Sequence, residues 1–323
     1  QKFIKKYKNL ISKKSQNIIE ENMICRGCAA KISQKSLKEI LPKDIITHSK
    51  DASPIPNYSE LLHSVDMINS IITDPFILGK ISANHALSDI YASVSQPISA
   101  QMILQLPSSS ENIQTRDLKQ IYFGAKMIFD ENNCKINGGH TMVGEDLHPT
   151  IGFSVIGKSH NKNTKKISHG DLVFLSGKIG SGLVFAGIHK DKIDSFYQKE
   201  VLTQMINGNL KIGKLLNKLN PLCSTDVTGF GVANHLINLI KRNQSSFGFS
   251  IKLNDIPIFQ GVEKCIKMSV RSSFYEQNYE AAKDFIFFNK NLTSKKEILF
   301  DPQTVGGLIF VVSKKSKKNV LNL

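Results

Sequence analysis

The stretch PFILGKISANHALSDIYA, residues 75–92, carries a structural and a chemical signal. Its apolar residues recur with helical spacing, at Ile77, Leu78, Ile81, Ala86, Leu87 and Ile90. Near its end, Asp89 stands among small and hydroxyl-bearing residues, a setting that suits a ligand of a hard cation better than an apolar core. The stretch therefore predicts a helix that presents a carboxylate.

Two other segments place an acid in a similar setting, Asp51 in DASP and Asp226 in STDVTGFG, just before a predicted helix over residues 232–242. The simpler alternatives are a surface position for Asp89 and a helix cap for Asp226. Three clustered carboxylates would repel one another unless a cation neutralised them, and Mg²⁺ prefers oxygen ligands. Together the acids predict a magnesium site beside a helix N-terminus that attracts phosphate.

Three further motifs carry chemical signals. INGGHT, residues 136–141, is predicted as a glycine turn whose amides approach an anion, with polar contacts from His140 and Thr141. GKIGSG, residues 177–182, follows a predicted strand and weakly resembles a phosphate loop, without Walker A or GxGxxG spacing. CRGCAAK has CxxC spacing at Cys25 and Cys28, but no second CxxC or His pair completes a zinc site. Lys31 favours the thiolate of Cys28, which predicts a reactive thiol.

The composition is that of an ordinary globular protein, with 41% hydrophobic and 21% charged residues among 323. No apolar run approaches the roughly 18 residues of a membrane span, and no signal peptide pattern is present. Five scattered cysteines favour a reducing cytoplasm. The net charge of +15 comes without any nucleic-acid-binding motif, so we interpret it as a lysine-rich surface and expect no nucleic-acid partner.

The chain divides into three parts. The apolar spacing of residues 1–22 predicts a basic amphipathic helix or linker. It would pack on its own domain or a neighbouring domain, or lie on a membrane surface. Residues 23–160 form a predicted N-terminal domain, with a strand over 102–107, a helix over 115–133 capped by Thr115, and a strand over 149–158. A polar, cationic run separates it from a C-terminal domain over 161–323. Without a strict βαβ rhythm, the pattern favours an α+β fold.

Five ordered motifs resemble the selenophosphate synthetase (selenide, water dikinase) family. They are the Cys28–Lys31 spacing, the block from Asn84 to Asp89 with Ser88, GGH at 138–140, TDVTGFG at 225–231, and DPQTVGG at 301–307. Their order and rough spacing hold from about Cys25 to the end of the chain. CRGCAAK together with RSSFYEQN, residues 271–278, is most similar to the branch fused behind an NADH-dehydrogenase-like domain.

The resemblance implies a two-domain fold like aminoimidazole ribonucleotide synthetase. The N-terminal domains of a homodimer would form a joint β-barrel at the dimer interface, the C-terminal domain would be an α/β sandwich, and ATP would lie between the domains. A fused or upstream oxidoreductase domain would suit the Met-less start and the basic leading helix.

The implied reaction converts ATP, selenide and water into selenophosphate, AMP and orthophosphate. Asp51, Asp89 and Asp226 would hold Mg²⁺ against the ATP phosphates. Cys28 would handle selenium and Lys31 would stabilise developing negative charge. The nucleotide site would be lined by Lys31, Asp66, Asp89, Gly139, His140 and Thr141.

The chain departs from the family pattern at Lys50, where another acid is usual, at Val94, where the family has glycine, and at Val305, where it has serine. It also stops at Leu323, before the family's last strands and helix. These changes bear on activity and stability, and motivate two alternatives: an ATP-binding relative with an interaction role, and a sister ATP-dependent enzyme of the same superfamily. Cys28 beside Lys31 argues against the sister enzyme.

Overall fold

The structure is a computed structural model and describes residues 51–159, 166–243, 245–289, 295–317 and 320. The predicted helix over residues 1–22, the CRGCAAK segment and Lys50 lie outside the described residues.

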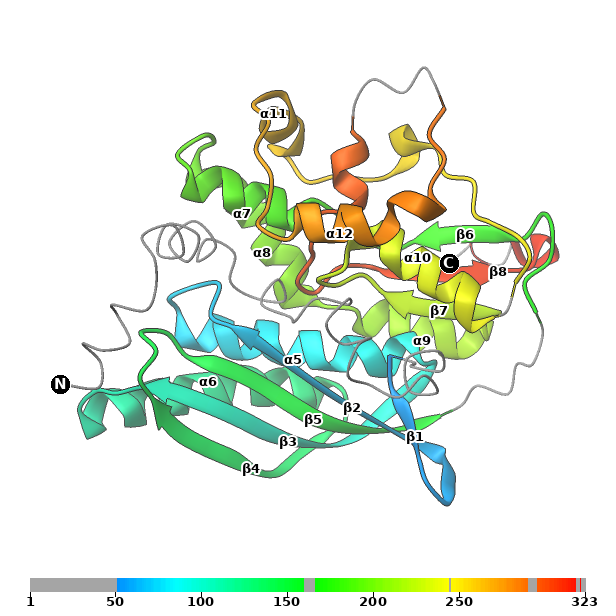
Figure 1. Cartoon of the computed structure of the whole chain (residues 1–323). Helices are drawn as coiled ribbons and strands as arrows, with labels where there is room; N and C mark the ends of the chain where they lie inside the picture. The colour runs from blue at the N-terminus through cyan, green and yellow to red at the C-terminus, as the bar shows by residue number, and fades with distance from the viewer. Residues whose placement is uncertain (1–50, 160–165, 244, 290–294, 318–319, 321–323) are drawn as a thin grey trace, which may run out of the picture.

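The first half of the described chain is built on a five-stranded sheet of order β1-β2-β5-β3-β4. Its strands are β1 (Ser53–Ile55), β2 (Tyr58–Asn69), β3 (Ser95–Pro107), β4 (Lys135–Gly144) and β5 (Thr150–Ser159). Neighbours are antiparallel except β3 and β4, which are parallel and joined by helix α6 (Glu111–Glu131) in one βαβ unit. Helices α5 (Pro75–Ala92) and α6 cover one face of the sheet (Figure 1).

The second half carries a smaller antiparallel sheet of order β6-β8-β7. Its strands are β6 (Leu172–Leu175), β7 (Cys223–Asp226) and β8 (Leu308–Val312). The helices are α7 (Ser181–His189), α8 (Gln198–Asn207), α9 (Leu210–Leu219), α10 (Gly231–Arg242), α11 (Val262–Lys267) and α12 (Tyr275–Ala282). The mixed α+β class predicted from the sequence is confirmed, while the domain boundary near residues 160–161 stays a prediction.

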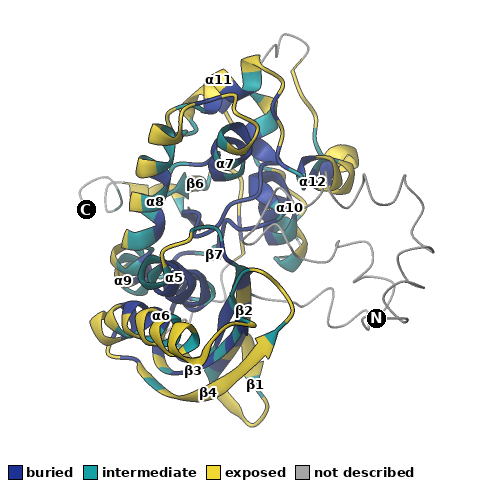
Figure 2. Ribbon diagram, turned by 90° about the vertical axis from the view of Figure 1, so that its left-hand side faces the viewer, coloured by how far each residue is buried: buried dark blue, intermediate teal, exposed yellow. Residues whose placement is uncertain are grey.

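Helix α5 is the central element and lies between the two sheets (Figures 1 and 2). Thirteen of its eighteen residues are buried, several of them polar. Towards the larger sheet, the Ser82 hydroxyl donates to the Ile151 carbonyl at 3.3 Å. Towards the second half, the Asn84 amide donates to the carbonyls of Met205 at 3.0 Å and Ile206 at 2.6 Å. Because buried polar groups are costly without partners, these contacts fix both halves of the chain to one helix.

The start of α5 follows from local sequence. The Asp74 carboxylate accepts the amide N–H of Ile77 at 2.9 Å, and Pro75 occupies the first helical position, where its missing N–H is no loss. The helix predicted over residues 75–92 is therefore confirmed with its boundaries.

Helices α5 and α6 approach each other closely at two glycines. A Cβ atom on Gly79 would lie 2.1 Å from the carbonyl oxygen of Ile121, and one on Gly124 would lie 2.0 Å from that of Phe76. Both distances are far below any real carbon–oxygen contact. Glycine at these two positions therefore sets the distance between the helices.

Two local predictions are wrong. Helix α6 begins at Glu111 with Ser110 as its N-cap, so Thr115 lies inside the helix and is not its cap. Residues 136–141, predicted as a glycine turn, are extended and belong to the edge strand β4. Glycine is needed there for a close approach instead, because a Cβ on Gly139 would lie 2.1 Å from the Met102 carbonyl oxygen.

Two of the departures from the family pattern fall at unusual backbone conformations. Val94 has φ of 53° and Val305 has φ of 48°, and both side chains are buried. This left-handed region suits glycine and is strained for a β-branched residue, by about 1–3 kcal/mol. Val94 therefore has a backbone conformation that glycine would adopt without strain.

The five-stranded sheet is open within the described residues, ending at β1 and β4. Its face opposite α5 and α6 exposes apolar side chains, with Val65 54%, Met67 39% and Ile98 41% exposed. The joint barrel is an arrangement of two copies and stays a prediction. No helix among the described residues has both the length and the apolar character to cross a membrane.

We expect Gly124→Ala to lower the free energy of unfolding by about 2–3 kcal/mol, because the added methyl group forces α5 and α6 apart. Urea unfolding followed by circular dichroism measures this change. Gly248→Ala is the matched control, since a Cβ there meets nothing within 4 Å. Equal stability of the two variants would contradict the close helix contact.

Candidate metal and phosphate site

Three carboxylates from distant parts of the chain meet at the junction of the two halves. Asp51, Asp89 and Asp226 each offer an oxygen atom, and these atoms lie within 4.8 Å of one another. Asp51 precedes β1, Asp89 lies in the last turn of α5, and Asp226 ends β7. The convergence predicted for these acids is therefore present in the fold, and neither a lone surface acid nor a helix cap describes it.

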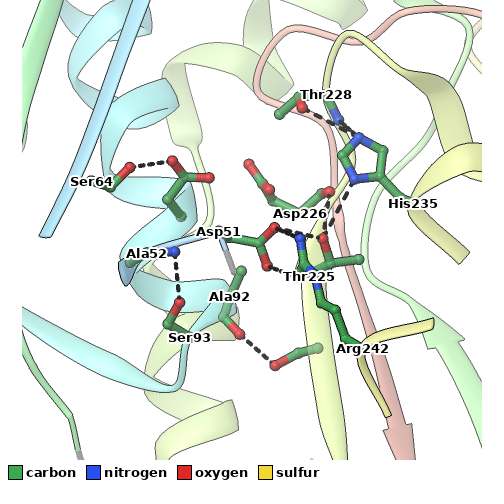
Figure 3. Close-up of polar contacts among 12 residues, drawn as sticks. Asp51, Ala52, Ser64, Ala92, Ser93, Thr225, Asp226, Thr228, His235 and Arg242 are labelled. Atoms are coloured by element: carbon green, nitrogen blue, oxygen red, sulfur yellow. Dashed lines mark hydrogen bonds and ion pairs between the residues drawn. The ribbon is translucent and has the colours of Figure 1, made fainter. Parts of the chain in front are cut away.

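Neighbouring hydroxyl groups hold two of the acidic segments in place. The Ser64 hydroxyl of β2 donates to Oδ2 of Asp89 (Figure 3). The Ser93 hydroxyl, just beyond α5, accepts the amide N–H of Ala52 at 3.3 Å and so ties the residue after Asp51 to the end of the helix. These contacts join the start of the described chain to α5.

Asp51 has the most extensive set of partners. The Thr225 hydroxyl donates to its Oδ1 at 3.1 Å, and the two terminal nitrogens of Arg242 reach Oδ2 at 3.1 Å and Oδ1 at 3.0 Å (Figure 3). Only 8% of the Asp51 side chain and 20% of the Arg242 side chain are exposed. A bidentate, largely buried pair of this kind is strong and directional.

His235 of α10 continues this network. Its Nε2 accepts the amide N–H of Thr228 at 3.1 Å, which places the ring proton on Nδ1. Nδ1 in turn faces the Thr225 hydroxyl at 3.4 Å (Figure 3). Thr225 can then direct its own proton to Asp51, so the buried imidazole orients a carboxylate that it does not touch.

The charges of all three carboxylates raise the pKa of Arg242. Burial alone would lower its pKa, but the charge and hydrogen bonds of Asp51, with further contributions from Asp226 and Asp89, raise the pKa above its ordinary value. The guanidinium is therefore firmly charged.

The donor set suits a hard divalent cation. Three carboxylates whose oxygens lie within 4.8 Å offer the oxygen ligands that Mg²⁺ prefers, and they carry more negative charge than the one guanidinium beside them offsets. The first turn of α10 is less available for phosphate, because Gly231 is packed against Leu299 and Phe300.

The other predicted site residues lie elsewhere or outside the described chain. Asp66 is buried on β2 and pairs with Nε2 of His85 at 2.9 Å. Gly139, His140 and Thr141 are exposed on β4. His140 is registered with Ile103 and so shares the sheet face opposite α5, away from Asp89. Cys28 and Lys31 fall among the residues that the structure does not describe.

The GKIGSG segment does not act as an open phosphate loop. The Gln303 side-chain oxygen accepts the amides of Gly180 at 3.0 Å and Ser181 at 3.1 Å, at the start of α7. Gln303 Nε2 donates to Oδ2 of Asp301 at 2.9 Å, so two residues of the DPQTVGG segment are bound to each other. The amides that would bind phosphate are therefore already occupied by the chain itself.

Arg242 and His235 were not predicted from the sequence. The only indication for His235 is its position among apolar residues on the largely buried face of α10, where a polar side chain needs a partner. For Arg242 there is no such indication, because a basic residue in the last turn of a helix is ordinary.

Comparison with known proteins finds relatives of similar sequence and solved structures of similar fold. Residues 49–159 match the model of AIR synthase related protein, N-terminal domain. The selenide, water dikinase of Campylobacter jejuni is 31% identical over 310 residues, covering 91% of this chain and 88% of that protein. That of Carboxydothermus hydrogenoformans is 27% identical over 314 residues, covering 92% and 89%. A thiamine monophosphate kinase structure from Aquifex aeolicus has a TM-score of 0.61 at 18% identity, covering 87% and 86%, which shows the shared fold.

We expect Asp301 to make stability depend on pH. Burial raises the pKa of Asp301 to about 7, against the lowering effect of the Leu183 amide and the Ser272 hydroxyl. The unfolded chain releases this proton near pH 3.8 and the folded chain near 7, so the free energy of unfolding should fall between these values. Urea unfolding at pH 5 and pH 7.5 should show wild type losing stability relative to Asp301→Asn. A difference that does not change with pH would refute this assignment.

Proposed function

The chain belongs to the selenide, water dikinase family, and from this premise we propose that it uses ATP to make selenophosphate from selenide and water, with release of AMP and orthophosphate. It is thus a phosphotransferase. The observation that carries the proposal is the convergence of Asp51, Asp89 and Asp226 in a chain so similar to enzymes of that name.

The tri-carboxylate cluster, defined as Asp51, Asp89 and Asp226, would hold Mg²⁺ with the phosphates of ATP. When bound, Mg²⁺ would neutralise phosphate charge and stabilise the charge that develops during phosphoryl transfer. The protein's own part is positioning: Ser64 orients Asp89, and Thr225 and Arg242 orient Asp51. Such fixed geometry is the main contribution that a protein makes to this chemistry.

We retain the remaining sequence assignments as parts of the proposal. Cys28 would carry or activate selenium, and Lys31 would stabilise charge on the transferred phosphoryl group. Lys31, Asp66 and Asp89 would line the nucleotide site with Gly139, His140 and Thr141. Asp66 would line the site from β2, and its carboxylate would also hold β2 against α5 through His85.

A homodimer would complete this arrangement. The exposed apolar residues on the open face of the five-stranded sheet offer an interface, and they support the predicted joint barrel. His140 lies on this face, so it would lie at the dimer interface. A cytoplasmic location and an upstream oxidoreductase domain stay predictions.

The decisive assay measures AMP and orthophosphate formed from ATP and Mg²⁺, with and without selenide under anaerobic conditions, by phosphorus NMR. We expect selenide-dependent turnover that Asp226→Asn lowers by at least about a hundredfold, because charge stabilisation at the phosphates is lost. Cys28→Ser should also lose most turnover. Asp130→Asn is the control, since its carboxylate pairs with Lys126 on the surface of α6.

Two outcomes would count against the activity. If ATP stays intact with selenide but Mg²⁺ and ATP together raise the melting temperature, the chain is an ATP-binding relative without turnover. If AMP forms without selenide and Cys28→Ser has no effect, the acceptor is a different molecule.

We expect Val65→Glu to convert a dimer into monomers, because a charge would be buried in the apolar face of the sheet. Size-exclusion chromatography with light scattering reports the mass. Phe123→Glu is the control, because Phe123 is 55% exposed on α6, away from this face. A wild-type monomer, or a dimer that survives Val65→Glu, would contradict the proposed interface.

A further inference from the structure

Arg242 places a fixed positive charge inside the tri-carboxylate cluster. Its two terminal nitrogens bind both oxygens of Asp51, at 3.0 and 3.1 Å (Figure 3). The charges of Asp226 and Asp89 also act on it. Its direct contacts are with Asp51, and the other two carboxylates lie close enough for their charge to act on it.

The helix dipole alone does not account for this geometry. A basic residue in the last turn of a helix is favourable because of the helix dipole, but that interaction needs no partner beyond the helix end. The other arginines with described ion pairs, Arg116 and Arg271, pair with Asp117 and Glu276 and are 61% and 46% exposed. Arg242 is only 20% exposed, and its partner is one of the three acids of the cluster.

The guanidinium of Arg242 changes the net charge of the cluster. Three carboxylates held within 4.8 Å repel one another strongly at this burial. One guanidinium reduces their formal charge from −3 to −2 and so reduces this repulsion. A divalent cation that uses Asp51 must then share a carboxylate whose two oxygens already accept hydrogen bonds from Arg242 and Thr225.

We propose that Arg242 is a positioning residue that keeps the tri-carboxylate cluster assembled without metal and competes with a divalent cation for Asp51. The inference deepens the proposed function, because it rests on the cluster being the metal site. Arg242 would therefore weaken metal binding in the absence of nucleotide. When ATP is bound, the negative charge of its phosphates would add to that of the carboxylates, and the metal would be held firmly.

The test compares wild type with Arg242→Met, which keeps the length of the side chain and removes its charge, in the absence of nucleotide. The first measurement is the melting temperature in EDTA, which we expect to fall in Arg242→Met and to recover on adding Mg²⁺ by more than in wild type. The second is Mn²⁺ affinity by calorimetry, which we expect to rise about tenfold in the variant. Arg116→Met is the matched control and should change neither quantity.

Two further variants separate the possible failures. Arg242→Lys keeps the charge without the bidentate contact, so it should be as stable as wild type in EDTA with an intermediate Mn²⁺ affinity; it also serves if Arg242→Met does not fold. Asp226→Asn should abolish Mn²⁺ binding. If wild type binds Mn²⁺, Asp226→Asn does not, and Arg242→Met binds no more tightly than wild type, the metal site stands and the role of Arg242 is overturned.

If Mn²⁺ affinity is the same in wild type and Asp226→Asn, the metal site and the role of Arg242 both fall, while the selenide-dependent assay is judged separately. A contact of Arg242 with nucleotide alone would leave EDTA stability and nucleotide-free Mn²⁺ affinity unchanged, and that result would also overturn the proposal.

Discussion

A helix buried on almost every side must find a partner for each of its polar groups, and the structure depends on this constraint at α5. On one side, His85 pairs with Asp66 of β2 at 2.9 Å, and one turn later Ser64 contacts Asp89. On the opposite side, Asn84 reaches the end of α8. An apolar helix could slide between the two sheets with little change in burial, whereas these directional bonds allow a single register.

The site is a consequence of that register. Asp89 is carried by α5 itself, and β7 is fixed against the same helix by the Ser224 hydroxyl, which donates to the Ala92 carbonyl at 2.6 Å. Asp226 ends this strand, so the two acids are brought together by packing between the halves. The resulting repulsion is offset by Arg242 and by oriented hydroxyl groups. The contacts of Arg242 and of these hydroxyl groups therefore serve both the stability of the cluster and its proposed chemistry.

The motifs that suggested the family divide into two kinds. Asp89 and Asp226 contribute to the cluster, whereas several of their neighbours hold the fold. Asn209 donates to Ser88 at 3.0 Å and to the Gly306 carbonyl at 2.8 Å, so one amide joins the motif on α5 to the DPQTVGG segment. Gln303 of that segment satisfies the first amides of α7. A family pattern read as one active site thus contains both the site and its supports.

The sequence by itself determined the features that depend on neighbours along the chain, namely the helix over residues 75–92 and the α+β class, and it singled out the three acids that packing brings together. Only the tertiary structure decided that residues 136–141 are an edge strand, that Gln303 closes the GKIGSG amides, and that Arg242 and His235 belong to the site. Periodicity and capping act over a few residues and are visible in sequence. Pairings such as that of Asp51 with Arg242 join residues nearly two hundred positions apart, and they exist only after packing has fixed α5 between the sheets.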